Sequence, residues 1–214
     1  MTEMNFTKYL QTVPLHNGSF DLFVPLQSDI QQAYLEQKSV DANADFPYWA
    51  KVWPSAIGLS MFLQAHPQLL QDKQVLELAA GLGLPSLVAA KYAQSVCCSD
   101  YVKAPLDFVE ASADHHQLTN IDYQIINWFT VPSTITADVL LLSDINYEPA
   151  AFAVLFEMIQ VFLAKQTTII LSTPQRLLAK PFIAQLLAFS TFQTEIEVLE
   201  NGVSVWVQVL LLQQ

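Results

Sequence analysis

"VLELAAGLGLPSLVAA", residues 75–90, is the stretch of sequence that decides the fold. The chain has five glycines in 214 residues, and two of them, Gly81 and Gly83, lie here two positions apart. An apolar, strand-like run precedes them, and a helix-like run follows with Pro85 near its first turn, where proline is tolerated. Glycine at such a junction permits positive φ and lets a ligand approach the backbone closely. A tight turn that binds no ligand would use glycine equally well.

Strand-like and helix-like segments alternate on both sides of this junction. Strands are expected at residues 73–79, 95–100, 121–128, 138–144 and 167–173, and helices at 55–66, 85–93, 103–118, 149–165 and 175–189. Alternation of this kind predicts an α/β fold, a parallel sheet with helices on both faces. Asn201-Gly202 separates two final strands and predicts a hairpin, so the last strand enters the sheet antiparallel. The helix at 175–189 is expected to bend at Pro181.

The N-terminal region has a different pattern. Asn17-Gly18 lies between two alternating segments and predicts a short β-hairpin, and residues 28–38 follow as a helix. A polar stretch at 39–47 is the one linker candidate. We therefore expect an extension over residues 1–47 and a main domain over residues 48–214.

The charge of the chain limits its partners. The net charge is −11 with only nine basic residues and no cluster of them, which disfavours nucleic acid. A basic protein segment or an amine is the more plausible partner. No apolar run reaches the ~20 residues that span a bilayer, and the N-terminus lacks a signal-peptide pattern. We expect a soluble, cytoplasmic protein that does not bind membranes.

Two residue pairs invite a metal or redox interpretation that their spacing does not favour. Cys97 and Cys98 are adjacent, so in a strand their side chains point to opposite faces, and we interpret them as buried apolar residues. His115 and His116 are adjacent on a helix and diverge, unlike a spaced metal-binding pair, so a solvated helix face is expected. The sequence predicts no metal site.

Acidic residues near the glycines narrow the class of ligand. A dinucleotide site would need a third glycine at position 86, which is Ser86, and no Walker lysine follows. Glu77 lies four residues before Gly81, where it would repel a pyrophosphate and attract a cation. Asp100 ends the next strand, where a carboxylate can accept hydrogen bonds from both ribose hydroxyls. A nucleoside with a positive charge and no phosphates, such as S-adenosylmethionine, fits these residues.

The sequence resembles a known family over residues 45–210. E-L-A-A-G-L-G (77–83) is similar to the D/E-x-G-x-G-x-G motif of class I S-adenosylmethionine-dependent methyltransferases, with alanine at the first glycine position. "YWAKVWPSA" (48–56) and the D-x-x-Y of "SDINYE" (143–148) resemble motifs of the protein-lysine methyltransferases called methyltransferase family 16. The resemblance implies a Rossmann-like, seven-stranded sheet, mostly parallel, with a C-terminal antiparallel hairpin.

The resemblance also implies roles for individual residues. Around the cofactor, it places Glu77, Ala79, Gly81 and Gly83 beside the methionine part, Asp100 at the ribose, Tyr101 and Trp128 at the adenine, Trp53 as a cover and Ser143 at the rim. Tyr147 would lie at the acceptor channel, and Asp144 would orient the acceptor and accept its proton. Core packing is the alternative role for Trp53 and Trp128. Capping of the following turn is the alternative for Asp144.

The expected activity is methyl transfer from S-adenosylmethionine to an amine, most plausibly a protein lysine. A small-molecule amine, or an arginine or histidine side chain, is an alternative acceptor. A module that binds S-adenosylmethionine without catalysis is the alternative from another class, because Ala79 departs from the motif.

Overall fold

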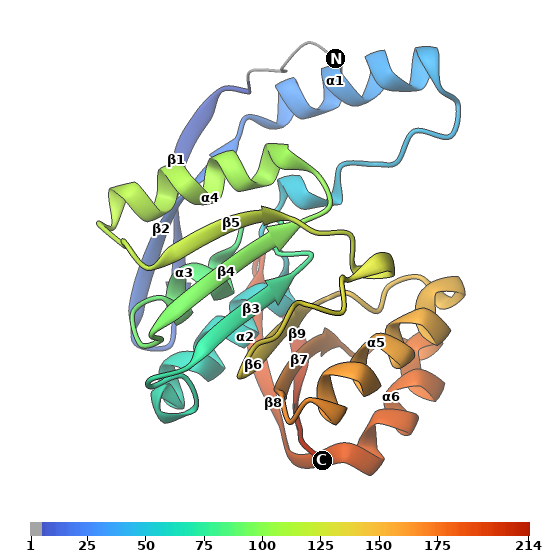
Figure 1. Cartoon of the computed structure of the whole chain (residues 1–214). Helices are drawn as coiled ribbons and strands as arrows, with labels where there is room; N and C mark the ends of the chain where they lie inside the picture. Colours follow the sequence, from blue (N-terminus) through green and yellow to red (C-terminus); the bar gives the residue numbers. More distant parts are fainter. Residues whose placement is uncertain (1–5) are drawn as a thin grey trace.

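A seven-stranded sheet forms the centre of the computed structural model, which describes residues 6–214 (Figure 1). Its strands are β3 (Gln74–Leu78), β4 (Ser95–Asp100), β5 (Ile121–Ile125), β6 (Val139–Ser143), β7 (Thr168–Pro174), β8 (Ser190–Glu200) and β9 (Val203–Leu212). The strand order is β5-β4-β3-β6-β7-β9-β8. β3 to β7 pair in parallel, and β9 is antiparallel to both of its neighbours. The predicted fold class and the terminal hairpin are therefore confirmed.

Helices cover both faces of the sheet, as the alternating pattern predicts. α2 (Pro54–Ala65), α3 (Leu84–Ala89) and α4 (Lys103–His115) pack on one face, and α5 (Phe152–Ala164) and α6 (Lys180–Leu186) on the other (Figure 1). Short 3₁₀ turns are η1 (Tyr48–Ala50), η2 (Pro67–Leu69), η3 (Trp128–Thr130), η4 (Pro149–Ala151), η5 (Leu177–Ala179) and η6 (Leu187–Phe189). Each face therefore has a hydrophobic core of its own.

The strand period decides which core each residue joins. In β3, Val75 faces the core under α2 to α4, whereas Leu76 and Leu78 face the core under α5 and α6. The same alternation separates Cys98, fully buried in the first core, from Cys97, which packs against the second. Cys98 is buried as predicted, whereas Cys97 is only partly buried, and both are free thiols.

The segment predicted as one helix over 175–189 is different in the structure. It consists of η5, α6 and η6 in succession. Pro181 lies in the first turn of α6, so the α-helix begins there rather than bending. A proline in the first turn removes an N–H that has no partner inside the helix, which makes this position favourable.

The N-terminal hairpin consists of β1 (Lys8–Leu15) and β2 (Gly18–Pro25) and is followed by α1 (Gln27–Val40). The hairpin is confirmed, although its two-residue loop is His16-Asn17 and Gly18 already pairs with Leu15. The ring of Phe20 packs against that of His116 in a tilted arrangement, with centroids 4.1 Å apart. The backbone N–H of Phe23 donates to Ser112 Oγ at 2.9 Å.

These contacts join the hairpin to α4 and to the core on that side of the sheet. His116 is half-buried by them, unlike the solvated residue that we expect from the sequence. The division of the chain at residue 47 stays a prediction. No helix within residues 6–214 combines the length and the apolar character needed to cross a bilayer.

Candidate active site

A cavity of about 560 Å³ opens where β3, β4 and β6 end. The chain runs from β3 outward to β4 and β5, and β6 and β7 lie on the opposite side of β3. This reversal is the switch point where open α/β sheets bind ligands. The volume lies within the range of roughly 300–1,000 Å³ that is usual for small-molecule pockets.

The cavity brings together nearly all the predicted site residues. Its lining includes Trp53, Ala79, Gly81, Gly83, Asp100, Tyr101, Trp128, Ser143, Asp144 and Tyr147. Glu77 is the exception, because its side chain is fully buried and does not line the cavity. After the roles that the sequence predicts, we call the loop 79–83 with Asp100, Glu77 and Ser86 the cofactor wall. We call the group of Asp144, Tyr147, Tyr48 and Arg176 the acceptor wall.

The glycine loop has a left-handed backbone at each motif position. Ala79, Gly81 and Gly83 have φ of 54°, 53° and 64°. A left-handed conformation costs a non-glycine residue about 1–2 kcal/mol. Ala79 therefore keeps the backbone shape that suits the missing glycine, at the cost of local strain.

Both glycines also allow close packing of the loop against neighbouring segments. A Cβ on Gly81 would lie 3.3 Å from the carbonyl oxygen of Trp49. A Cβ on Gly83 would lie 2.7 Å from a methyl group of Val109 and 3.2 Å from Cys98 Sγ. The junction is thus a tight packed turn and a cavity wall at once, so the two interpretations of the glycines are compatible.

Glu77 supports the loop from beneath. Its position in β3 places the side chain on the same face as Val75, toward α3, and its Oε2 accepts hydrogen bonds from Ser86 N at 2.9 Å and Ser86 Oγ at 2.5 Å. The residue at the missing third glycine is therefore the partner of Glu77, a relation that the sequence alone did not reveal.

The charge of Glu77 also differs from the expectation. Burial raises the pKa of Glu77 from 4.5 to about 8, and the two hydrogen bonds from Ser86 only partly oppose this. The carboxyl is therefore mainly protonated at neutral pH and faces away from the cavity. Attraction of a cation by Glu77, as inferred from the sequence, is not supported by this geometry.

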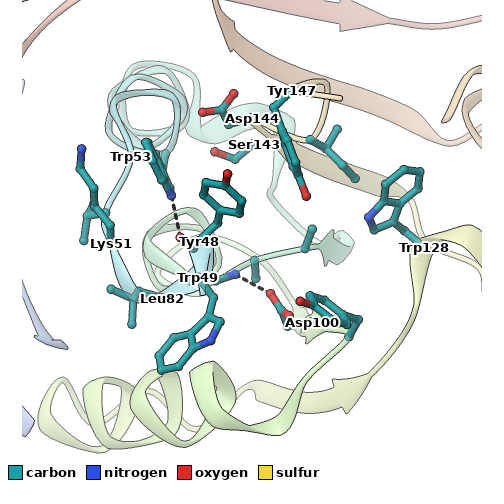
Figure 2. A pocket seen from close by; sticks show the side chains of 18 of the residues that line it. Tyr48, Trp49, Lys51, Trp53, Leu82, Asp100, Trp128, Ser143, Asp144 and Tyr147 are labelled. Carbon is teal, nitrogen blue, oxygen red and sulfur yellow. Dashed lines mark hydrogen bonds between the residues drawn. The ribbon is translucent and has the colours of Figure 1, made fainter. Parts of the chain in front are cut away.

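Asp100 is the carboxylate that does face the cavity from the cofactor wall. It is 3% exposed, and its Oδ2 accepts a hydrogen bond of 2.9 Å from the backbone N–H of Gly81 (Figure 2). Burial raises the pKa of Asp100, and backbone N–H groups of Gly81, Val102 and Tyr101 oppose the rise. This hydrogen bond connects the end of β4 to the glycine loop and fixes the carboxylate between them.

Aromatic side chains flank the cofactor wall. Trp128, which begins η3 after β5, is buried at 8% exposure and stacks on Phe129 with a centroid distance of 3.9 Å. Tyr101 is half-exposed at the end of β4. Trp128 belongs to the core under α5 and also lines the cavity, so packing and lining occur together.

A chain of aromatic contacts brings the segment before α2 to the acceptor wall. Tyr48 lies 5.7 Å from Tyr147 and 6.2 Å from Trp53, measured between ring centroids. The indole N–H of Trp53 donates to the carbonyl oxygen of Tyr48 at 2.8 Å. Figure 2 shows Tyr147 beside Tyr48, with its ring pointing into the cavity. Tyr48 begins the motif stretch 48–56 but received no role from the sequence, because nothing local shows that it reaches Tyr147.

Asp144 contacts Arg176 through both of its carboxylate oxygens. Its two carboxylate oxygens accept from the two terminal nitrogens of Arg176, and the Nη2–Oδ2 distance is 2.9 Å. Burial raises the pKa of Asp144 and the guanidinium of Arg176 opposes the rise. Asp144 has a φ of 54° and makes no capping hydrogen bond to the turn that follows. Arg176, whose role was open in the sequence, is therefore the partner of Asp144.

The mouth of the cavity has an excess of negative charge. Asp45 and Glu148 are exposed there, and both raise the pKa of Tyr147, after burial, which is the larger cause. The two cations of the lining are both engaged, Arg176 with Asp144 and Lys51 with Glu200 at 2.5 Å. The acidic composition of the chain is thus present at the site itself.

Comparison with known proteins gives the family. Residues 36–188 match the profile of the lysine methyltransferase family. The chain belongs to this family. The matched range contains every residue of both walls, from Tyr48 to Arg176. The resemblance that the sequence motifs indicate, from W-P-S to D-x-x-Y, is thus confirmed.

Named relatives in this family differ in the side chain that they modify. The chain is 33% identical to the mouse histone-arginine methyltransferase METTL23 over 111 residues, which is 49% of this chain and 44% of that protein. It is 30% identical to the Xenopus tropicalis protein N-lysine methyltransferase METTL21A over 135 residues, 59% of this chain and 61% of that protein. The chain spans about half the length of the curated relatives it matches.

Solved structures share the fold at low sequence identity. The Thermus thermophilus 16S rRNA N2 G1207 methyltransferase RsmC, in complex with AdoMet and guanosine, matches with a TM-score of 0.63 and 14% identity over 98% of this chain and 51% of that chain. The Pyrococcus horikoshii protein PH1948, described as an RNA methyltransferase, matches with a TM-score of 0.58 and 16% identity over 73% of this chain and 83% of that chain. These similarities show a shared Rossmann-like fold.

Proposed function

We propose that this protein transfers a methyl group from S-adenosylmethionine to a side-chain nitrogen of a polypeptide, with lysine as the first candidate. One observation carries the proposal: a single cavity at the switch point of a lysine methyltransferase fold contains both the motif loop and the D-x-x-Y residues. S-adenosylmethionine supplies a methyl group already activated on a sulfonium.

The cofactor wall fits the nucleoside and amino-acid parts of this cofactor. Asp100 presents a carboxylate at the end of β4 for the ribose hydroxyls, and Trp128 and Tyr101 offer aromatic surfaces for the base. The loop 79–83 offers close access to its backbone. The hydrogen bonds between Glu77 and Ser86 join the strand before this loop to the helix after it.

The acceptor wall is suited to a nitrogen that must attack in its neutral form. The nitrogen lone pair forms the new N–C bond, the C–S bond breaks with its electrons going to sulfur, and the nitrogen releases a proton. A free lysine has a pKa of about 10.4, so the site has to favour loss of that proton. The aromatic rings of Tyr48 and Tyr147, with centroids 5.7 Å apart, offer apolar surfaces that orient the alkyl chain of the acceptor.

The charge at the mouth favours a basic polypeptide segment over nucleic acid. Four carboxylates line the cavity, those of Asp45, Asp100, Asp144 and Glu148, whereas its two cations are already paired. Phosphate groups would be repelled there, and basic residues beside the acceptor would be attracted. Arginine is the second candidate acceptor, because the METTL23 relatives are named histone-arginine methyltransferases.

Calorimetry with S-adenosylmethionine and S-adenosylhomocysteine tests the cofactor. We expect both to bind, and Asp100→Ala to raise the Kd at least tenfold, or about 1.4 kcal/mol. Asp122→Ala is the matched control, because Asp122 is exposed on β5 and does not line the cavity. Absence of binding to the folded protein would refute the proposal.

Incubation of a cell extract with methyl-labelled cofactor tests the acceptor. Label in polypeptides, recovered as methyl-lysine after hydrolysis, is the expected result. Methyl-arginine would select the second candidate. Label confined to small molecules would contradict a polypeptide acceptor.

A further inference from the structure

The single arginine of the chain neutralises the carboxylate of the acceptor wall. Arg176 lies between β7 and η5, and Asp144 follows β6, so the pair links the ends of two adjacent parallel strands. The side chain of Asp144 is 9% exposed and that of Arg176 is 34% exposed. Both side chains line the cavity, so the pair faces any acceptor that enters.

A free carboxylate at this position would oppose the reaction. An opposite charge within about 4–6 Å favours the charged form of an amine, so an unpaired Asp144 would hold a lysine as its ammonium ion. An ammonium ion has no lone pair with which to attack a methyl group. A carboxylate engaged on both oxygens by a guanidinium presents little net charge to a third group, and its best acceptor directions are already used.

We propose that Arg176 acts through Asp144 to admit the acceptor nitrogen in its neutral form, by occupying both carboxylate oxygens. This inference rests on the proposed function. Arg176 is thus a positioning residue: it holds Asp144 in one orientation and cancels its charge. The proton of the acceptor then leaves to solvent at the open mouth rather than being retained by Asp144.

The other charged and titratable groups around the pair do not replace Arg176. From the remaining elements of the cavity these are Asp45, Tyr48 and Lys51 before α2, Asp100 and Tyr101 at β4, and Tyr147 and Glu148 after β6. Lys51 pairs with Glu200, and Asp100 is held by the N–H of Gly81. The remaining carboxylates, Asp45 and Glu148, are exposed at the mouth and add negative charge. Arg176 is therefore the cation that balances Asp144.

The test uses n-butylammonium, which has the length and charge of a lysine side chain, and n-butanol as its neutral counterpart. Binding to the full chain is followed by the indole ¹⁵N–¹H shift of Trp53, which lines the cavity. For Arg176→Gln we expect the Kd of n-butylammonium to fall about fivefold or more at pH 7.5, while that of n-butanol stays unchanged. A purely structural role for Arg176 would weaken both ligands or neither.

The pH dependence of this gain in affinity for n-butylammonium is a second readout. In Arg176→Gln the gain should disappear as the pH falls, because burial favours protonation of an Asp144 that has lost its cation. Wild-type binding should change less over the same range. In the double variant Asp144→Asn/Arg176→Gln the gain should be absent at every pH.

Two controls keep the outcome interpretable. Lys180→Gln removes the same charge nearby, from an exposed residue outside the cavity lining, and should leave n-butylammonium binding unchanged. Arg176→Lys retains a cation beside Asp144, so its gain in affinity for n-butylammonium should be smaller than that of Arg176→Gln or absent. This variant also covers the case in which Arg176→Gln does not fold. Unchanged cation affinity in a folded Arg176→Gln would overturn the inference. Cofactor binding, measured separately, would still decide the proposed function.

Discussion

The cofactor wall and the acceptor wall of the same cavity are built in different ways. In the cofactor wall, Glu77 and Ser86 are fully buried and Asp100 is nearly so. The backbone of the loop lies against α4 at Gly83. In the acceptor wall, Tyr48 and Tyr147 are half-exposed, and Asp144 depends on an arginine from another loop. The first wall is part of the hydrophobic core, whereas the second consists of side chains placed over it.

Because of this difference, we expect substitutions in the two walls to affect stability and activity to different degrees. A change in the cofactor wall disturbs buried hydrogen bonds and packing, so it should affect folding as well as ligand binding. A change in the acceptor wall removes mainly partly exposed contacts, so it should affect the reaction and leave the fold intact. Three substitutions test this contrast, from the largest expected effect on stability to the smallest.

Gly83→Ala should have the largest effect. Its Cβ would lie 2.7 Å from a Val109 methyl group in a backbone with a φ of 64°. Overpacking and left-handed strain together should lower the free energy of unfolding by about 2–5 kcal/mol. Urea unfolding measures this loss. Gly202→Ala is the control, because Gly202 has a φ of 79° and no atom within 4 Å of an added Cβ. Equal losses in the two variants would show that packing at Gly83 is unimportant.

Glu77→Gln should change the dependence of stability on pH. The pKa of Glu77 is raised from 4.5 to about 8 on folding, so its contribution to stability is complete below 4.5 and is lost as the pH rises toward 8. The wild type should therefore lose on the order of 3 kcal/mol between pH 5 and pH 7.5 from this group, and the variant should lose less.

Urea unfolding at several pH values compares the two slopes. A constant offset from the buried amide of Gln does not affect this comparison, because the amide does not titrate in the range. Parallel slopes in wild type and variant would mean that Glu77 is ionised in the folded protein at neutral pH. The cofactor wall would then contain a buried charge.

Tyr147→Ala should have the smallest effect on stability. Tyr147 is 49% exposed and its ring contacts that of Tyr48. The free energy of unfolding should change by less than about 0.5–1 kcal/mol, while methyl transfer to polypeptides should fall. Tyr147→Phe, which keeps the ring, separates packing from the hydroxyl group. A loss of stability as large as that of Gly83→Ala would abolish the distinction between the two walls.

The sequence predicted the cofactor wall better than the acceptor wall. Gly81, Gly83 and Asp100 follow from a short motif, because strand endings and positive φ values are local properties of the chain. Even there, the sequence did not show where the side chain of Glu77 points. The motif marks the residue, but the strand period turns its side chain toward Ser86 rather than into the cavity.

The acceptor wall depends on contacts between residues far apart in the chain. Asp144 and Arg176 are separated by 32 residues, and Tyr48 meets Tyr147 across about one hundred. Nothing local in either segment specifies its partner. Asp144 meets Arg176 because β6 and β7 are adjacent and parallel, so the loops at their carboxyl ends lie together.

The sequence by itself therefore determined the succession of strands and helices along the chain, the acidic character and the motif loop. All of these depend on composition and on residues close together in the chain. The tertiary structure alone decided that Arg176 pairs with Asp144, that Ser86 supports Glu77 and that Tyr48 reaches the cavity. The physical reason is that hydrogen bonds and ion pairs act over a few ångströms in space. Which distant residues come within that distance depends on the register of the sheet and the packing of its helices.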